Sequence, residues 1–279
     1  MKSLAKPTEV PADVFETCIS RIKKIRLQNK LRACKPLITS ASLEFENKVS
    51  ALQLHTINRE IIVNGNVKAK ELEKVYKSRM AKKGSPGRSL YDKLLAAPAH
   101  GICPLCSQRI ATTLDHHLPK ALYPRLAIVP INLVPSCTDC NKLKRAKYPL
   151  NSAQETLHPY FDNIEKDLWL DANLIRTSPI VVNYFINPPA EWNAILIDRV
   201  KYHFDSLSLN KLYSSNAGSE IVQIKDQLDR IYARSGKEGV RLHLLESAES
   251  RAKVNSNSWK AVMYKMLGND IWFCDKGWT

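Results

Sequence analysis

The sequence predicts a mainly α protein with a small α+β core near its middle. Apolar residues recur at helical spacing towards both ends of the chain, whereas short runs rich in β-branched residues lie at 109–116 and 128–133. The middle also holds two closely spaced cysteine pairs. We therefore expect three regions: a basic helical region at 1–98, a compact core at 99–161 and a mostly helical region at 162–279.

The first region is expected to be built from four helical segments. Phe15, Ile19 and Ile22 follow a helical period, and Pro11 suits a first helical position. The segments are expected at 11–35, 40–62, 67–81 and 88–97, with NGN at 64–66 as a break. Residues 21–35 carry basic side chains and no acid, so this face either lies along a phosphate backbone or is simply solvated. The turn KKGSPGRS at 82–89 lacks the residue order of a phosphate-binding loop.

The third region is again mostly helical by its apolar pattern. Helices are expected at 191–204, 220–234, 236–251 and 258–267, separated by Pro, Ser, Asn and Gly. The run TSPIVVNYFI at 177–186 is β-branched and aromatic, which indicates a strand.

The charge balance favours a polyanionic partner. Forty-two Lys and Arg against 27 Asp and Glu give a net charge of +15, and neutralising phosphates releases their condensed counterions. Nucleic acid is the leading partner class, although charge alone leaves a membrane surface, or no such partner, open. No apolar run of about 18 residues exists. The start of the chain also lacks the apolar segment of a signal peptide, so we expect a cytoplasmic protein without membrane insertion.

The cysteine pairs predict a structural zinc ion. Cys103, Cys106, Cys137 and Cys140 form two CxxC turns, which supply the four thiolates that tetrahedral zinc prefers. A redox role for one pair is the competing interpretation. Four sulfur ligands leave no open position for water, so this zinc is structural. The leftover Cys18 is expected to pack in the core.

Zinc does not account for the polar residues between the pairs. Residues 109–116 are predicted to form a strand, 128–133 a second one, and 138–147 a basic helix that begins at the second cysteine turn. Two strands and a helix held together by zinc would bring Asp115 and His116 against Asn141.

These residues carry a resemblance to a known family. The order D-H-x-x-P, then N-L, then C-x-x-C-N-x-x-K resembles the HNH endonucleases, also called ββα-metal or His-Me finger nucleases, in their four-cysteine zinc form. The similarity covers residues 101–161. It implies that the core is an HNH nuclease domain with a zinc-stapled ββα-metal finger.

The resemblance also implies roles for particular residues. His116 would be the general base, Asp115 and Asn141 the oxygen ligands of one catalytic Mg²⁺ or Mn²⁺, and Asn132 a brace for the loop that orients the histidine. A backbone carbonyl would fix the imidazole tautomer. Flanking phosphates would be held by Lys142, Lys144, Arg145 and Lys147.

Two features depart from the simplest pattern. Asn141 stands where the family name has a histidine, which favours a hard ion in the catalytic position. Asp115 and His116 are adjacent, and successive strand residues point to opposite faces, so the strand must end or distort there. His117 is the alternative base, and a structural hydrogen bond is expected for His158.

The expected function is metal-dependent hydrolysis of phosphodiester bonds in DNA. The alternatives are a non-catalytic zinc-ribbon protein that binds nucleic acid or a partner protein, and an RNA-directed nuclease. One such site cuts one strand, so a double-strand break needs a dimer or two nicks. The order C-P-x-C, D-H-x-x-P, N-L and H-P-Y-F also resembles nuclease effectors of bacterial anti-phage systems of the Septu or type II Zorya kind, which implies partner proteins of a defence system.

Overall fold

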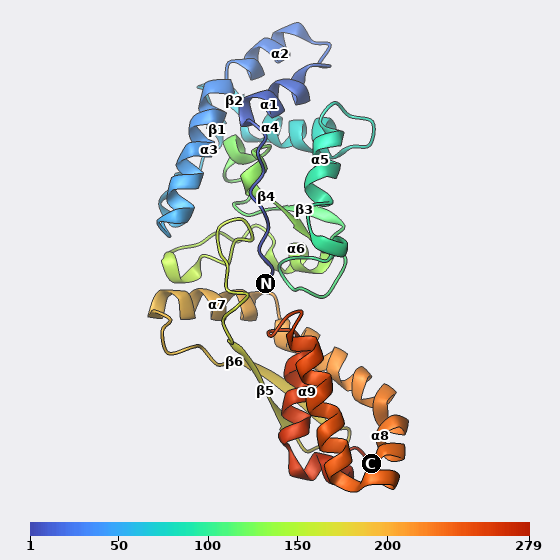
Figure 1. The fold of residues 1–279 in the computed structure, drawn as a ribbon. Coiled ribbons are helices and arrows are strands. Elements are labelled where there is room, and N and C mark those ends of the chain that lie inside the picture. Colours follow the sequence, from blue (N-terminus) through green and yellow to red (C-terminus); the bar gives the residue numbers. More distant parts are fainter. The chain divides into compact units, whose positions relative to one another are not determined.

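The computed structural model describes residues 1–279, and the chain divides into two compact units, Met1–Asn163 and Ile164–Thr279 (Figure 1). Helices dominate, and every sheet is a pair of antiparallel strands, as the mainly α fold class predicts. The first unit takes in the predicted regions 1–98 and 99–161, whose division remains a prediction. No helix combines the length and the apolar character that crossing a membrane requires.

The first unit contains six α-helices and two strand pairs. The helices are α1 (Pro11–Ile19), α2 (Ile25–Arg32), α3 (Lys35–Ser50), α4 (Ala69–Val75), α5 (Arg88–Leu95) and α6 (Thr138–Lys144). The strands are β1 (Ile62–Val63), β2 (Val67–Lys68), β3 (Thr113–His116) and β4 (Leu133–Ser136). The short 3-10 or π turns are η1 (Leu54–Thr56), η2 (Tyr76–Ala81), η3 (Ala99–Gly101), η4 (Pro124–Leu126), η5 (Pro130–Asn132) and η6 (Ser152–Gln154).

The helix expected over residues 11–35 is two helices. Pro11 does begin α1, and its apolar face is buried. The chain leaves the helical path after Ile19, and the buried amide of Gln28 donates hydrogen bonds to the carbonyls of Ile19 and Ser20 at 3.1 and 3.0 Å. A side chain of α2 therefore satisfies the carbonyls at the end of α1, and the two helices meet at an angle.

The helix expected over 40–62 begins earlier and ends at Ser50. Leu52, with φ of 56°, has left-handed backbone, which a helix cannot continue through. The NGN break is the turn of a hairpin, in which Val63 pairs with Val67. Asn64 and Gly65 supply positive φ values of 49° and 70° at this turn. The predicted break at 64–66 is therefore confirmed, whereas the two short strands beside it were not predicted.

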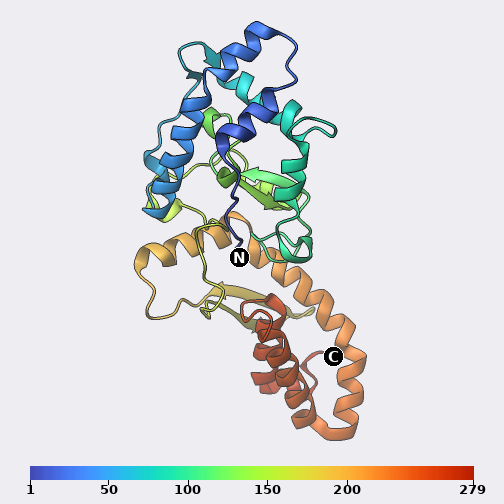
Figure 2. The same ribbon diagram turned by 45° about the horizontal axis from the view of Figure 1, so that its top comes forward.

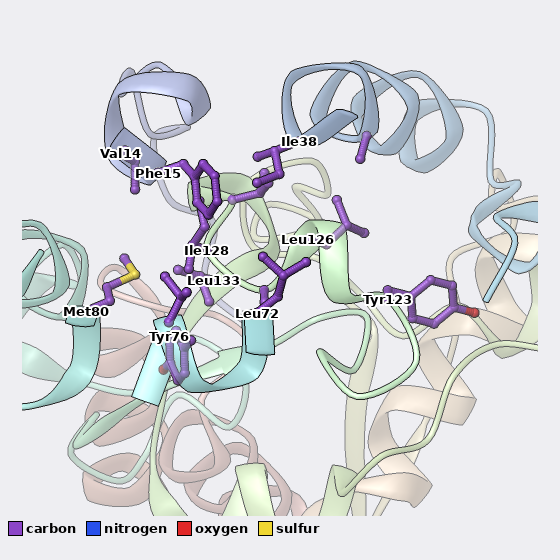
Figure 3. Packing of buried hydrophobic residues seen from close by; sticks show 14 of the residues in the cluster. Val14, Phe15, Ile38, Leu72, Tyr76, Met80, Tyr123, Leu126, Ile128 and Leu133 are labelled. Atoms are coloured by element: carbon purple, nitrogen blue, oxygen red, sulfur yellow. The ribbon is translucent and has the colours of Figure 1, made fainter. Parts of the chain in front are cut away.

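A buried apolar cluster holds the first unit together. It joins side chains of α1, α3, α4 and η2 to residues of the segment 114–133. Figure 3 shows Leu72 and Tyr76 pointing into it from α4 and η2, beside Ile128 and Leu133. Fully burying one such side chain is worth roughly 1.5–3 kcal/mol. The helices therefore act as the support against which β3 and the following loop are fixed.

The strands β3 and β4 pair antiparallel, and α6 follows at once. Asp115 lies opposite Val134, and His116 opposite Leu133. The second strand was expected at 128–133, which is wrong: Pro130 begins the 3-10 turn η5, and the strand starts only after it. The first strand is also shorter than predicted, because residues before Thr113 belong to the cysteine turn. The helix ends before 147, since Arg145 has a φ of 52°.

The second unit consists of one strand pair and three helices. Its elements are β5 (Leu170–Ile175), β6 (Val181–Ile186), α7 (Ala194–Ser206), α8 (Leu209–Ala252), α9 (Trp259–Asn269) and the π turn η7 (Phe273–Gly277). The predicted strand at 177–186 is β6, and its partner β5 was not predicted. The helices expected at 220–234 and 236–251 are both parts of α8, which kinks at Gly236 with φ of 61°.

Helix α9 packs along α8, as both ribbon views show (Figures 1 and 2). The close approach needs a glycine: a Cβ atom at Gly268 would lie 2.9 Å from the side chain of Leu245. The second unit therefore has a helical pairing of its own, and none of the predicted site residues lies in it.

Candidate functional site

The four cysteines of the two CxxC turns form one buried cluster. The Sγ atoms of Cys103, Cys106, Cys137 and Cys140 all lie within 4.8 Å of one another, and no residue of the set is more than 3% exposed. Zinc–sulfur bonds of about 2.3 Å in a tetrahedron place sulfur atoms slightly under 4 Å apart. The cluster could therefore hold a metal ion, and its all-sulfur chemistry fits structural zinc.

Local backbone geometry makes the two cysteine turns. Ser107, with φ of 54°, reverses the chain after Cys106, and its N–H donates to the Cys103 carbonyl at 2.8 Å. Cys137 is the N-cap of α6, and its sulfur accepts from the N–H of Cys140 at 3.4 Å. The hydrogen bond from the Cys106 thiol lowers the pKa of Cys103 to about 7. The same contacts raise the pKa values of Cys106 and Cys140, so the four thiols share protons that a metal ion would displace on binding.

Asp115 forms a buried ion pair with a lysine from the end of α6. Its Oδ2 lies 3.0 Å from Nζ of Lys144, and the same ammonium donates to the carbonyl of His116 at 2.5 Å. Burial raises the pKa of Asp115, and the charge of Lys144 partly offsets that rise. Lys144 was expected to contact phosphate. It is instead only 7% exposed, and its side chain links the end of α6 to β3.

His116 is held in one tautomer by its surroundings. Its Nε2 lies 2.9 Å from the carbonyl oxygen of Ala127, which makes the expected backbone contact. Because a carbonyl only accepts, Nε2 carries the proton and Nδ1 is the basic nitrogen. The ring of Tyr76 meets the imidazole edge-on at 4.4 Å between centroids. Burial, followed by the charge of Lys120, holds the pKa of His116 well below its usual 6.5.

Asp115 and His116 contact different elements, as expected for neighbours on a strand. The carboxylate of Asp115 meets α6, whereas the imidazole of His116 meets η2 and the loop at Ala127. Lys144 connects them, because its ammonium reaches both the Asp115 side chain and the His116 carbonyl. His117 lies elsewhere: its ring packs against that of His158 at 4.3 Å and edge-on to Phe45.

Asn132 fixes the loop that follows His116. Its Oδ1 accepts from the N–H of Leu118 at 2.7 Å, and its Nδ2 donates to the carbonyls of Leu118 and Leu126 at 3.0 and 3.1 Å. Its own carbonyl accepts from the N–H of His117 at 2.8 Å. The residue is fully buried. These contacts hold the segment between His117 and Ala127, and so the carbonyl that orients His116.

The remaining predicted residues lie on or just after α6. Asn141 is partly buried, one turn before Lys144 and therefore on the same side of the helix. Its side chain has no hydrogen-bond partner within the chain, so its predicted link to Asp115 rests on this placement alone. Lys142, Arg145 and Lys147 are exposed, and no carboxylate pairs with them.

Two residues near His116 were not found from the sequence. Tyr76 contacts the imidazole, and the Nζ of Lys120 lies 5.4 Å from the centre of the Tyr76 ring. Burial lowers the pKa of Lys120, whose charge acts on both Asp115 and His116. Lys120 directly follows the D-H-x-x-P pattern, which was a usable signal, whereas Tyr76 comes from a distant helix that no local pattern connects to the site.

The fold and the cluster define a mainly helical chain with a four-cysteine site that could bind a metal. The chain is 28% identical over 289 aligned residues to the protein ea31 of Escherichia phage lambda, covering 96% of this chain and 97% of the relative. The similarity therefore extends over both units rather than the cysteine region alone. No protein-family model matches the chain, and no solved structure matches it.

Proposed function

We propose that the protein is a metal-dependent endonuclease of the HNH, or ββα-metal, kind that hydrolyses phosphodiester bonds in DNA. The single observation that carries the proposal is the arrangement of β3, β4 and α6 beside the cysteine cluster, with Asp115, His116 and Asn141 on the strand and the helix. This combination goes beyond what a binding module needs, since a zinc knuckle requires only the cysteines.

In this proposal His116 is the general base. The contact from Nε2 to Ala127 leaves Nδ1 to accept a proton from water, whose oxygen then attacks phosphorus as the 3′ oxygen departs. Asn132 is a positioning residue, because it holds the loop that carries Ala127. Tyr76 packs on the imidazole and limits its rotation.

Asp115 and Asn141 would hold one Mg²⁺ or Mn²⁺, which when bound supplies charge stabilisation for the phosphate and the leaving oxygen. Both residues offer oxygen, as these hard ions prefer, and Mg²⁺ usually keeps several waters beside one or two protein ligands. The fit is incomplete as the chain stands, because Asp115 is already paired with Lys144. The proposal therefore requires Lys144 to leave the carboxylate, after which it is free to contact phosphate.

Exposed cations near the site are proposed to hold the DNA backbone. Lys142, Arg145 and Lys147 have no acidic partner, and the whole chain carries +15. Such contacts position a strand without reading its sequence.

The test is a cleavage assay on supercoiled plasmid with Mg²⁺, with Mn²⁺ and with EDTA. His116→Ala is expected to lose at least about 100-fold in rate, the usual contribution of a general base. His243→Ala, a histidine of α8 in the second unit, is the matched control and is expected to cut normally. Cleavage that survives His116→Ala, or that persists in EDTA, would reject the assignment. Structured RNA in the same assay separates the RNA-directed alternative.

One observation favours a second candidate, a zinc-bearing protein that binds nucleic acid without cutting it. The pair between Asp115 and Lys144 already balances the buried charge without any ion. If this candidate is right, the purified protein retards labelled DNA in a gel with the same affinity whether or not Mg²⁺ is present, and no cut product forms.

We further propose that the nuclease acts as an effector in anti-phage defence, together with partner proteins. The support is the motif order from Cys103 to Phe161. Bacteria expressing the gene with its neighbours are expected to plate phage less efficiently than bacteria carrying His116→Ala. Equal plating by the two strains would reject the defence role. The proposed nuclease activity would still be judged by the plasmid assay alone.

A further inference from the structure

A cleft of about 510 Å³ lies in the first unit, and neither the cysteine cluster nor Asp115 and His116 line it. Its walls are the turn between α1 and α2, helix α2 itself, and the side of α4 and η2. These segments lie together at one end of the first unit in Figure 1. The volume falls within the range of about 300–1,000 Å³ that small-molecule sites occupy.

The rim of the cleft is strongly cationic. Five basic side chains line it, and none of them pairs with a carboxylate: Arg21, Lys23, Lys24, Lys74 and Arg79. The one acid in the lining, Glu71, is already held by Lys30 at 2.7 Å and by the N–H of Lys68 at 2.8 Å. Unpaired like charges that converge on one hollow repel one another, so an anion bound there would stabilise the folded state.

The floor of the cleft is apolar. Leu31 and Val75 are 1% and 3% exposed and belong to the core cluster, while Ile22 and Leu27 are half-buried beside them. Inorganic phosphate would leave this surface uncovered. An aliphatic floor beneath a cationic rim fits a ligand with an apolar part and several negative charges.

The walls are formed without any ligand. Gln28 ties α2 to the end of α1 through hydrogen bonds to the carbonyls of Ile19 and Ser20. Across the cleft, a guanidinium N–H of Arg79 lies 3.4 Å from the carbonyl oxygen of Arg21, which links η2 to the same turn. A site whose walls are already fixed loses little entropy when it binds.

We propose that this cleft binds a nucleoside phosphate, with its phosphates among the lysines and arginines of the rim and its base on the partly exposed Ile22 and Leu27. In this site the cations would take the part that backbone amides play in a glycine-rich phosphate loop. The ligand is either a free nucleotide or the phosphorylated end of a nucleic-acid strand. The site stands apart from the nuclease proposal, because none of its residues takes part in the proposed cleavage.

Isothermal titration with ATP, tripolyphosphate and adenosine, without added divalent ion, tests the ligand class. ATP is expected to bind at least about tenfold more tightly than tripolyphosphate, since only ATP covers the floor, and adenosine to bind more weakly than ATP. Tripolyphosphate binding as tightly as ATP would overturn the proposal, as would the absence of ATP binding. Because neither DNA nor divalent ion is present, the result is independent of any nuclease activity.

Charge reversal tests the place of binding. Lys24→Glu with Lys74→Glu is expected to weaken ATP binding by more than about tenfold. The matched control, Lys211→Glu with Lys225→Glu on α8, changes the net charge equally and is expected to bind as the wild type does. Ser78→Trp, which fills the cleft without changing charge, is expected to abolish binding while circular dichroism stays unchanged. Equal weakening by the control pair, or full binding by a folded Ser78→Trp variant, would overturn the proposal.

Competition identifies the source of the ligand. A 5′-phosphorylated single-stranded oligonucleotide that displaces ATP assigns the cleft to the end of a strand. Failure to displace ATP, with ATP bound in the cleft, assigns it to a free nucleotide. Either result supports a nucleoside phosphate site.

Discussion

Helix α6 has a different kind of cluster at each end. At its start, Cys137 and Cys140 meet Cys103 and Cys106, four like ligands within one small sphere. At its end, Lys144 meets Asp115, and the two charges already cancel. The sulfur cluster is complete only with a metal, whereas the polar cluster is balanced without one. The two clusters therefore differ in whether their own residues leave a charge unmet.

The largest expected effect is at the sulfur cluster. Cys140→Ser is expected to lose its zinc and the cooperative unfolding of the first unit, because structural zinc contributes on the order of 10 kcal/mol to folding. Cys274→Ser, which changes a buried cysteine of the second unit, is the control and should keep one zinc per chain. Metal content and thermal unfolding measure both. Equal zinc content in the two variants would contradict the expectation that the four-cysteine cluster, unlike the polar cluster, depends on a metal ion.

The next effect is at the other end of α6. Lys144→Met leaves Asp115 buried without its partner and is expected to cost about 3–5 kcal/mol in urea unfolding. If Asp115 binds a divalent ion, Mg²⁺ will raise the stability of this variant more than that of the wild type, because the ion replaces the missing ammonium.

Replacing both partners provides the control for that measurement. Asp115→Leu with Lys144→Met is expected to recover most of the loss, since no charge is left unpaired. A Lys144→Met protein as stable as the wild type would show that the pair contributes nothing, and one that ignores Mg²⁺ would argue against Asp115 as a metal ligand.

A smaller loss is expected at the loop beside the polar cluster. Asn132→Ala leaves the buried N–H and carbonyl of Leu118 and the carbonyl of Leu126 without their partner, at a cost of about 2–4 kcal/mol. Asn173→Ala removes an exposed hydrogen bond in β5 and is expected to cost well under 1 kcal/mol. Similar losses for the two variants would mean that Asn132 does not brace the loop.

The smallest effect is a pH dependence of stability that comes from His116 in the polar cluster. The folded state holds the pKa of His116 well below 6.5, so at acidic pH the unfolded chain binds the proton more readily. The contribution of His116 to stability therefore rises with pH up to about 6.5, by at most about 1.4 kcal/mol per pH unit, whereas the raised pKa of Asp115 acts in the opposite sense at lower pH. His116→Gln is expected to flatten this rise between pH 5 and 6.5, and His243→Ala is expected to keep it. Identical slopes in urea unfolding would contradict the assignment.

The cysteine cluster could be predicted from the sequence because its geometry is local. Each CxxC turn places two sulfurs together, and only the meeting of the two turns depends on the fold. The beginning of α6 was likewise predictable, since Cys137 caps it. A hydrogen bond between His116 and a backbone carbonyl was also expected. Only the structure shows that this carbonyl belongs to Ala127.

The partners of the polar cluster could not be predicted, because they come from distant segments. Tyr76 reaches His116 from η2, and nothing in the local sequence connects them. Lys144 looked like one more cation on a basic helix, and burial against Asp115 changes its role. The position predicted for β4 was wrong. The prediction followed the apolar residues around Ile128, although Pro130 begins a 3-10 turn and the strand starts only after it.

Helix α6 connects the two clusters, with Cys137 as its N-cap and Lys144 as its last residue. Withdrawing zinc acts on sulfur alone, yet it also releases the anchor that keeps the lysine on Asp115. Under the proposed function, a cell starved of zinc would make a protein in which Lys144 and Asp115 are no longer held together, so the supply of one metal would control how the site for another is assembled.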